Sequence, residues 1–167
     1  ALRERALLTE VKQLRAEVVE RYGFENIVGA TASIQRVFEL ISAVADSSAL
    51  VLLTGPTGTG KELLAHALHY RSPRREGPFV AINFAALPQS LLESELFGHE
   101  KGAFTGAIRQ HRGKFEQANG GTLLLDELGE VSLSTQVRLL RVLESGELQR
   151  VGGSETIKID VRVIAAT

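Results

Sequence analysis

Apolar and polar positions along the chain repeat with two different periods, one typical of helices and one typical of buried strands. Near the N-terminus apolar residues recur at steps of four, three and four, at Leu7, Val11, Leu14 and Val18. This spacing predicts an amphipathic helix with a short heptad-like seam. Two interpretations stay open: a helix that packs on its own domain, or a linker that dimerises or relays a signal from an upstream domain. The pattern breaks at residues 22–24, so we expect a linker helix over 1–24 and a folded domain over 25–167.

Beyond residue 30, helical and strand-like patterns follow one another. Strand-like runs cover residues 50–54, 79–83, 122–126 and 161–167, and helical patterns cover 33–45, 60–70, 89–96 and 134–145. Ser33 is a plausible N-cap for the first of these helices. Strands separated by helices require crossover connections, which predict a largely parallel sheet covered on both faces, a three-layer α/β fold.

One segment interrupts this alternation. Residues 148–151 and 156–160 flank Gly152, Gly153 and Ser154, which can supply the positive φ angles of a tight turn. We therefore expect a β-hairpin between the last helix and the last strand.

Composition narrows the class of protein. The 167 residues are 44% hydrophobic with a net charge of -1, which favours one folded domain and gives no excess of cations for nonspecific nucleic-acid binding. Cysteine is absent, and the longest apolar run, residues 50–53, is far shorter than the ~20 residues that span a bilayer. These features predict a soluble, cytoplasmic protein without a membrane partner. Because residues 161–167 end without a turn or cap, we also expect a fragment of a longer protein.

A glycine-rich segment joins the strand-like run 50–54 to the next helix and carries the spacing of a P-loop. It consists of Gly55, Pro56, Thr57, Gly58, Thr59, Gly60 and Lys61. Such a loop curls its backbone N–H groups around phosphate oxygens, with the helix dipole and the lysine adding positive charge. An ordinary glycine turn would not explain a lysine at the helix entrance, where its charge opposes the dipole. Glu62 stands where many P-loops place a Ser or Thr ligand of Mg²⁺, so metal ligands are expected elsewhere.

Three polar residues at predicted strand ends are candidates for the remaining chemistry. Asp126 and Glu127 follow a buried strand, and open α/β sheets bind ligands at such ends. Asp126 is suited to hold Mg²⁺ or its water, and Glu127 to polarise an attacking water. A solvated strand end before a helix cap is the alternative. Asn83 either hydrogen-bonds Glu127 or is a simple turn residue.

The segment Gly102, Ala103, Phe104, Thr105, Gly106 and Ala107 lacks any period. One interpretation is a hinged loop that presents Phe104 and Thr105 to a partner, and the other is a tight turn whose Phe104 folds into the core.

Five segments together resemble the AAA+ domain of sigma-54-dependent transcription activators, the NtrC-like bacterial enhancer-binding proteins. They are residues 55–62, 95–100, 102–107, 120–127 and 150–153, within a match from about residue 27 to 167. The resemblance implies a P-loop ATPase that uses ATP and Mg²⁺, assembles into a hexameric or heptameric ring, and remodels sigma-54 RNA polymerase holoenzyme through the hexapeptide 102–107.

The resemblance also implies roles for single residues. Asn83 and Glu127 would form a switch that senses the γ-phosphate, Thr167 would begin the sensor I segment, and Arg150 would lie near a subunit interface. Glu62 is usual in the family, whereas Pro56 is not. His99 is a candidate for orienting the hexapeptide, and the other histidines, His66, His69 and His111, are read as ordinary helix or loop residues.

The family's arginine fingers, helical lid and DNA-binding domain would follow Thr167, so DNA contact would come only from that domain and this fragment alone would hydrolyse ATP weakly. Two rival functions remain. An AAA+ remodeller of another substrate would leave Phe104 and Thr105 unexplained. A nucleotide-dependent assembly module without turnover would not need the second acid, Glu127.

Overall fold

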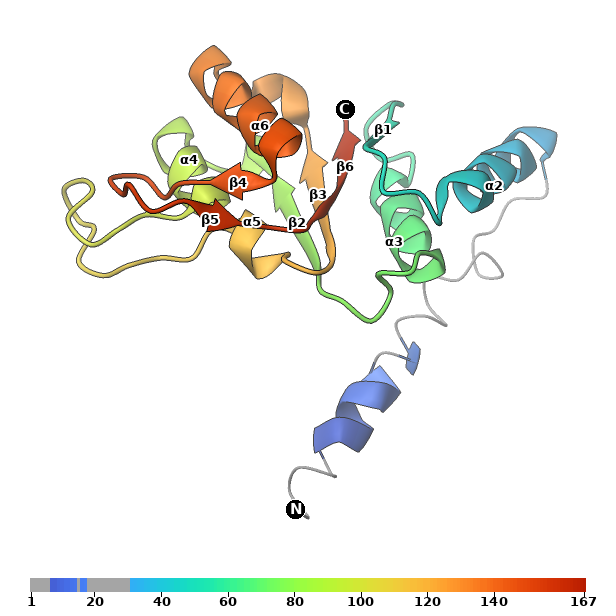
Figure 1. Cartoon of the computed structure of the whole chain (residues 1–167). Helices are drawn as coiled ribbons and strands as arrows, with labels where there is room; N and C mark the ends of the chain where they lie inside the picture. The colour runs from blue at the N-terminus through green and yellow to red at the C-terminus, as the bar shows by residue number, and fades with distance from the viewer. Residues whose placement is uncertain (1–6, 15, 18–30) are drawn as a thin grey trace.

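In the computed structural model, residues 7–14, 16–17 and 31–167 are described (Figure 1). Residues 7–14 and 16–17 are helical, and Leu7, Val11 and Leu14 of the predicted seam are exposed. Val18 and the expected domain boundary after residue 24 lie outside the described residues. None of the described helices is both long and apolar enough to cross a membrane.

A parallel four-stranded sheet forms the centre of the molecule, in the order β1-β6-β3-β2. Its strands are β1 (Val51–Leu53), β2 (Phe79–Asn83), β3 (Thr122–Asp126) and β6 (Arg162–Ala166). The strand boundaries lie within two residues of the predicted ones. Pairing places Asn83 beside Asp126, and Asp126 beside Ala166, which in turn pairs with Leu53 of β1. The carboxyl ends of all four strands therefore meet at one edge of the sheet.

Helices cover both faces of this sheet (Figure 1). They are α2 (Ala32–Val44), α3 (Lys61–Arg71), α4 (Gln89–Phe97), α5 (Lys114–Gln117) and α6 (Leu133–Ser145), with single 3-10 turns η2 (Phe84–Ala86) and η3 (Leu128–Glu130). On β3, Leu123 and Leu125 pack with the cluster that includes α4, α5 and α6, whereas Leu124 packs with α2 and α3. This alternation divides the core into two layers and confirms the three-layer α/β prediction.

The structure corrects one local prediction, the N-cap of the first helix, and shortens another, the hairpin. Helix α2 begins at Ala32 with Thr31 as its N-cap, because the Thr31 carbonyl already accepts bonds from Ile34 N and Gln35 N; Ser33 lies inside the first turn. The hairpin exists, but its paired strands are only β4 (Glu147–Leu148) and β5 (Ile157–Lys158). Val151 forms a bridge with His99 instead of pairing within the hairpin.

Two buried polar side chains connect the layers. Arg162, 2% exposed at the start of β6, donates from Nη1 to Ala45 O and from Nη2 to Val44 O, at 2.5 and 2.7 Å, so it caps the C-terminus of α2. His69 of α3 lies with its Nδ1 2.8 Å from Thr122 Oγ1 of β3. Burial, with a smaller contribution from His66, lowers the His69 pKa to about 4, so this ring is neutral at pH 7. His69 is therefore a structural residue of this fold.

Candidate functional site

The P-loop connects the end of β1 to the start of α3, as predicted. Gly60 is the N-cap of α3 and has φ 87°, a left-handed conformation that strains any residue with a Cβ. A Cβ at this position would meet no other atom within 4 Å, so the backbone angle, not space, requires glycine here. Gly60 thereby begins an 11-residue helix, whose first N–H groups have no carbonyl partner within the helix and can bind an anion.

The lysine of the loop folds back under it. Lys61 Nζ donates to Gly55 O at 2.8 Å and to Pro56 O at 3.0 Å, and Thr59 Oγ1 also donates to Pro56 O, at 2.7 Å. The ammonium group is thus held at the mouth of the loop, where it can exchange these carbonyls for phosphate oxygens.

Asp126 and Glu127 lie half-buried at the end of β3. Asp126 Oδ1 accepts a bond from Glu127 N at 3.0 Å. Glu127 has φ 57° and ψ 48°, and among the described residues no other non-glycine residue has a positive φ. Such a conformation is unfavourable for a residue with a Cβ and concentrates at functional sites. The Glu127 side chain therefore leaves the backbone in a different direction from that of a residue in an extended strand.

These residues line one cavity of about 330 Å³ at the carboxyl edge of the sheet. Its lining consists of Thr57, Gly58, Gly60, Lys61, Glu62, Asn83, Asp126 and Glu127. All eight were sequence candidates. A lysine and a helix N-terminus on one side suit phosphate, and two carboxylates on the other suit a divalent cation and a water. The donor set therefore fits a nucleoside triphosphate with Mg²⁺.

Asn83 of the cavity lining and Thr167, which lies near the P-loop, were also sequence candidates. The Asn83 amide oxygen accepts a bond from Ala85 N at 2.9 Å and begins η2, which is the turn role; its pairing with Glu127 stays a prediction. Thr167 follows β6, and its backbone bonds to Leu53 O and Gly55 N at the entrance of the P-loop. Thr167 is therefore hydrogen-bonded to the first residue of the P-loop.

The hexapeptide forms a loop that is closed at its base. Gly102 N donates to Ala107 O at 2.8 Å, and Ala107 is buried. Thr105 is exposed, and Phe104 is 40% exposed with its ring edge-to-face on the His99 imidazole, 4.9 Å between centroids. The structure therefore lies between the two interpretations of Phe104: the ring is neither buried in the core nor free of the protein.

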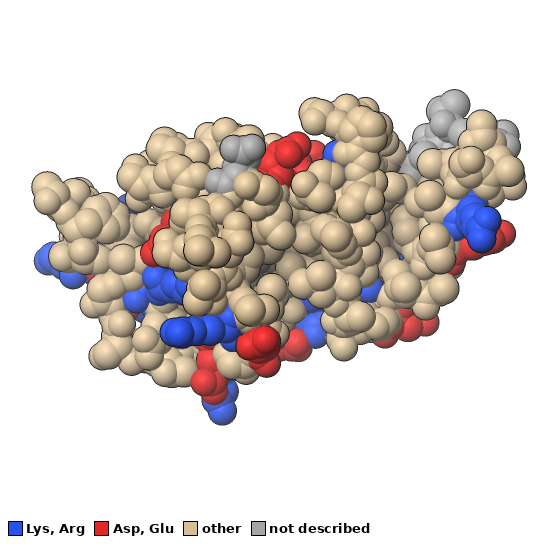
Figure 2. All heavy atoms as spheres, turned by 90° about the horizontal axis from the view of Figure 1, so that it is seen from above, with Lys and Arg blue, Asp and Glu red and all other residues tan. Residues whose placement is uncertain are grey.

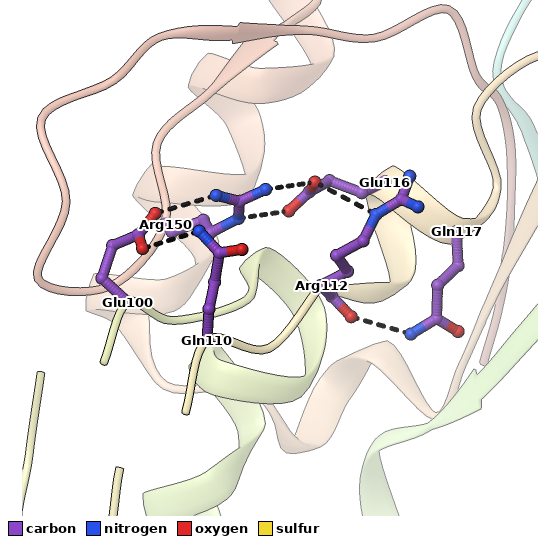
Figure 3. Close-up of polar contacts among 6 residues, drawn as sticks. All are labelled: Glu100, Gln110, Arg112, Glu116, Gln117 and Arg150. Carbon is purple, nitrogen blue, oxygen red and sulfur yellow. Dashed lines mark hydrogen bonds and ion pairs between the residues drawn. The ribbon is translucent and has the colours of Figure 1, made fainter. Parts of the chain in front are cut away.

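An ion-pair network centred on Arg150 joins the hairpin to the base of this loop (Figure 3). Arg150 binds Glu116 of α5 in a bidentate manner, through Nε and Nη2, each at 2.8 Å, and donates from Nη1 to Glu100 at 2.8 Å. Gln110 donates to the second oxygen of Glu100. The Arg150 and Glu116 side chains are only 11% and 6% exposed. The arginine holds the pKa of Glu100 below its ordinary value, and both carboxylates raise the pKa of Arg150.

Sequence reasoning singled out Arg150 but missed its partners. Glu116 lies 34 residues from Arg150 in the chain, and no local pattern connects them. All three guanidinium nitrogens of Arg150, Nε, Nη1 and Nη2, donate to carboxylates of the same chain. A role for Arg150 near a subunit interface stays a prediction.

Charges on the sheet's carboxyl-edge side are mixed. Figure 2, seen from above, shows Lys and Arg interspersed with Asp and Glu instead of one extended patch. This agrees with the net charge of -1.

Gly152 contacts the hexapeptide. Its φ is 74°, and a Cβ there would lie 2.7 Å from Ala103 Cβ and 2.9 Å from Ala103 Cα. We expect Gly152→Ala to displace the loop and to speed trypsin cleavage after Lys101 or Arg109, since the added methyl cannot be accommodated without movement. Limited proteolysis followed by mass spectrometry measures this.

Gly120→Ala is the matched control for this prediction. Gly120 has φ 80°, but a Cβ there would meet nothing within 4 Å. Both variants carry the left-handed strain of roughly 1–2 kcal/mol, so only Gly152→Ala should loosen the loop. Equal cleavage of the two variants would refute a steric contact between the turn and the loop.

Comparison with known proteins places this site in context. The model of a family described as the sigma-54 interaction domain matches residues 27–167. The Nif-specific regulatory protein of Azotobacter vinelandii is 59% identical over 159 residues, which are 95% of this chain and 30% of that protein. The DNA-binding transcriptional regulator NtrC of Escherichia coli K12 is 54% identical over 168 residues, 100% of this chain and 36% of NtrC. The chain thus spans about a third of these relatives.

Solved structures share the fold as well. The crystal structure of NtrX from Brucella abortus in complex with ATP superposes with a TM-score of 0.78 at 35% identity, covering 98% of this chain and 36% of NtrX.

Proposed function

This chain belongs to the sigma-54 interaction domain family, and from that premise we propose that it binds and hydrolyses ATP with Mg²⁺ and uses the energy to remodel sigma-54 RNA polymerase holoenzyme. The single observation that carries the ATPase proposal is the cavity itself. It brings Lys61 at the start of α3 together with Asp126 and Glu127 at the end of β3, which lie more than 60 residues further along the chain.

Each group has a distinct task in this proposal. Lys61 and the N-terminus of α3 hold the β- and γ-phosphates, and Asp126 is the residue that would hold Mg²⁺, which neutralises charge on the phosphates when bound. Glu127 accepts a hydrogen bond from the attacking water and orients it. Asn83 lies in the same cavity, where it would hydrogen-bond Glu127 and sense the γ-phosphate. The ATP in the NtrX complex supports this choice of nucleotide.

The hexapeptide 102–107 is the proposed contact with sigma-54. It is not part of the cavity lining, and it exposes Thr105 and part of Phe104. The separation lets one end of the domain carry the chemistry while a loop presents side chains to the polymerase. An enzyme that acts on RNA polymerase would work in the cytoplasm.

Assembly and DNA binding belong to the same proposal. We infer that the intact protein forms a ring, with Arg150 near a subunit interface and Thr167 beginning a sensor segment. DNA contact would come from another domain. The relatives of which this chain covers about a third include one described as DNA-binding, which supports that division.

Phe104→Ala, placed in the full-length protein, should remove open-complex formation at a sigma-54 promoter while ATP turnover continues. The partly exposed ring is not part of the ATP cavity, so its loss should affect the partner and not the nucleotide. Thr105→Ala is expected to act in the same direction. Promoter opening is measured by permanganate footprinting, and turnover by phosphate release.

Wild-type ATP affinity in both variants is the control for folding. Loss of ATP binding in Phe104→Ala would contradict the proposal, because the ring would then support the nucleotide site instead of a partner. Normal promoter opening by both variants would mean that another surface engages sigma-54.

A further inference from the structure

Phe104 has a specific support within its own chain. Its ring lies on the His99 imidazole at 4.9 Å between centroids and 65° between planes, a favourable edge-to-face geometry. The 40% exposed fraction of Phe104 means that more than half of the residue is covered before any partner arrives. The ring is thus held in place at the surface.

The backbone of His99 is fixed on both sides. His99 N donates to His111 O at 3.0 Å, and His111 N returns a bond to His99 O at 2.9 Å. On the other side Val151 N donates to Gly98 O, and Glu100 N donates to Val151 O. His99 therefore lies in the central one of three short segments, and it pairs with His111 on one side and with Val151 on the other.

Its imidazole is fixed as well. Nδ1 lies 2.6 Å from Ser94 Oγ of α4, and Ser94 is buried. The His111 ring stacks on His99 at 5.4 Å and 27°, and His111 Nε2 lies 3.7 Å from Glu95 Oε1. Two consecutive residues of α4 thus contact the two imidazoles. Together they orient the ring on which Phe104 rests.

The backbone of the loop is closed by bonds from Gly102 N to Ala107 O and from Ala107 N to Phe104 O, at 2.8 and 3.0 Å. These bonds fix the main chain but do not hold the Phe104 side chain. Without the imidazole, the aromatic ring would sample many positions, and binding a partner would cost the entropy of selecting one of them.

We propose that His99 is a positioning residue for sigma-54 engagement, with its imidazole serving as the platform that holds the Phe104 ring in the orientation that the partner meets. The inference rests on the proposed function for its partner. The position of the ring, however, can be tested without sigma-54.

The first test is ¹⁹F NMR of 4-fluorophenylalanine at position 104 in the full-length protein. Removal of the imidazole in His99→Ala should change the ¹⁹F shift and move it toward the value of an exposed ring. His99→Phe keeps an aromatic platform, so its ¹⁹F shift should stay close to that of the unsubstituted protein. An unchanged ¹⁹F shift in His99→Ala would overturn the proposal whether or not sigma-54 binds.

The second test is a double-mutant cycle on sigma-54 affinity, measured by fluorescence anisotropy with a non-hydrolysable ATP analogue. His99→Ala should weaken binding about three- to tenfold, the range given by the usual strength of an aromatic pair. In a Phe104→Ala background the same substitution should have almost no further effect, because the ring that it supports is gone. His99→Phe should restore most of the lost affinity.

The outcomes separate the two proposals. Equal losses in both backgrounds, or a His99→Phe variant as weak as His99→Ala, would overturn the platform role of His99. Unsubstituted protein that shows no affinity for sigma-54 would instead contradict the proposed function, and the ¹⁹F result would then decide on His99 alone. Thermal unfolding of each variant confirms that the domain is folded.

Discussion

ATP turnover should fall by about 100- to 10,000-fold when Glu127 is replaced by glutamine, while ATP still binds. The amide has nearly the size of the carboxylate but cannot accept a proton from water, so the variant removes one chemical property and leaves the cavity's shape. The left-handed backbone at φ 57° is equally strained in both proteins. Turnover is measured by phosphate release, and affinity by titration with a fluorescent ATP analogue.

Lys61→Ala is the matched comparison. In this variant ATP binding should be lost, whereas in Glu127→Gln binding should remain and only turnover should fall. It removes the ammonium that bonds to Gly55 O and Pro56 O at the mouth of the loop, so nucleotide affinity itself should be lost. Normal turnover in Glu127→Gln would show that another group polarises the water. Loss of binding in that variant would show that Glu127 holds the nucleotide.

Arg150→Met should lower the free energy of unfolding by about 3–5 kcal/mol at pH 7. The substitution leaves the Glu116 carboxylate, 6% exposed, without the bidentate partner that compensates its burial. A thioether of similar length retains the packing but supplies no donor. Urea denaturation followed by circular dichroism measures the change.

Arg112→Met is the control, because Arg112 also pairs with Glu116, at 3.6 Å, but is 69% exposed. An exposed ion pair of this kind contributes at most about 1 kcal/mol. Adding Glu116→Gln to Arg150→Met should recover part of the loss. If the two arginine variants cost the same, the buried pair does not stabilise the fold.

The same network gives a pH dependence with a defined sign. Hydrogen bonds from Arg150 and Gln110 lower the pKa of Glu100, so its contribution to stability is present above its ordinary value of 4.5 and is lost as pH falls through the lower folded pKa. This acid-dependent loss should be smaller in Arg150→Met.

The alternation of strands and helices was predictable because it depends on local pattern. Thr122–Asp126 alternates its side chains between two buried layers and therefore reads as a continuous apolar run, bounded by glycines before it and acids after it. The P-loop was equally visible, since its glycines and lysine are adjacent in the chain. Asn83 and Asp126 were both predicted at strand ends, and the parallel pairing of β2 with β3 places these two ends side by side.

Contacts that depend on three-dimensional register were not predictable. Val151 was expected in the hairpin, but its backbone pairs with the segment around His99, 52 residues earlier. The hairpin is consequently shorter than its apolar pattern suggests. No sequence pattern links Glu116 to Arg150, and Ser94 carries no signal for its contact with His99. Such pairings are set by the packing of whole elements.

The left-handed backbone of Glu127 bears on how this domain can evolve. Glycine adopts this conformation without strain, and asparagine tolerates it better than glutamate does. Selection for folding alone would therefore favour Gly or Asn at this position, and either residue would raise stability while removing the carboxylate. In the role proposed for it, Glu127 therefore lowers stability in exchange for a carboxylate that acts on water. Variant libraries selected only for thermal stability should replace glutamate at this position by Gly or Asn. The selected domains should be more stable but unable to turn over ATP.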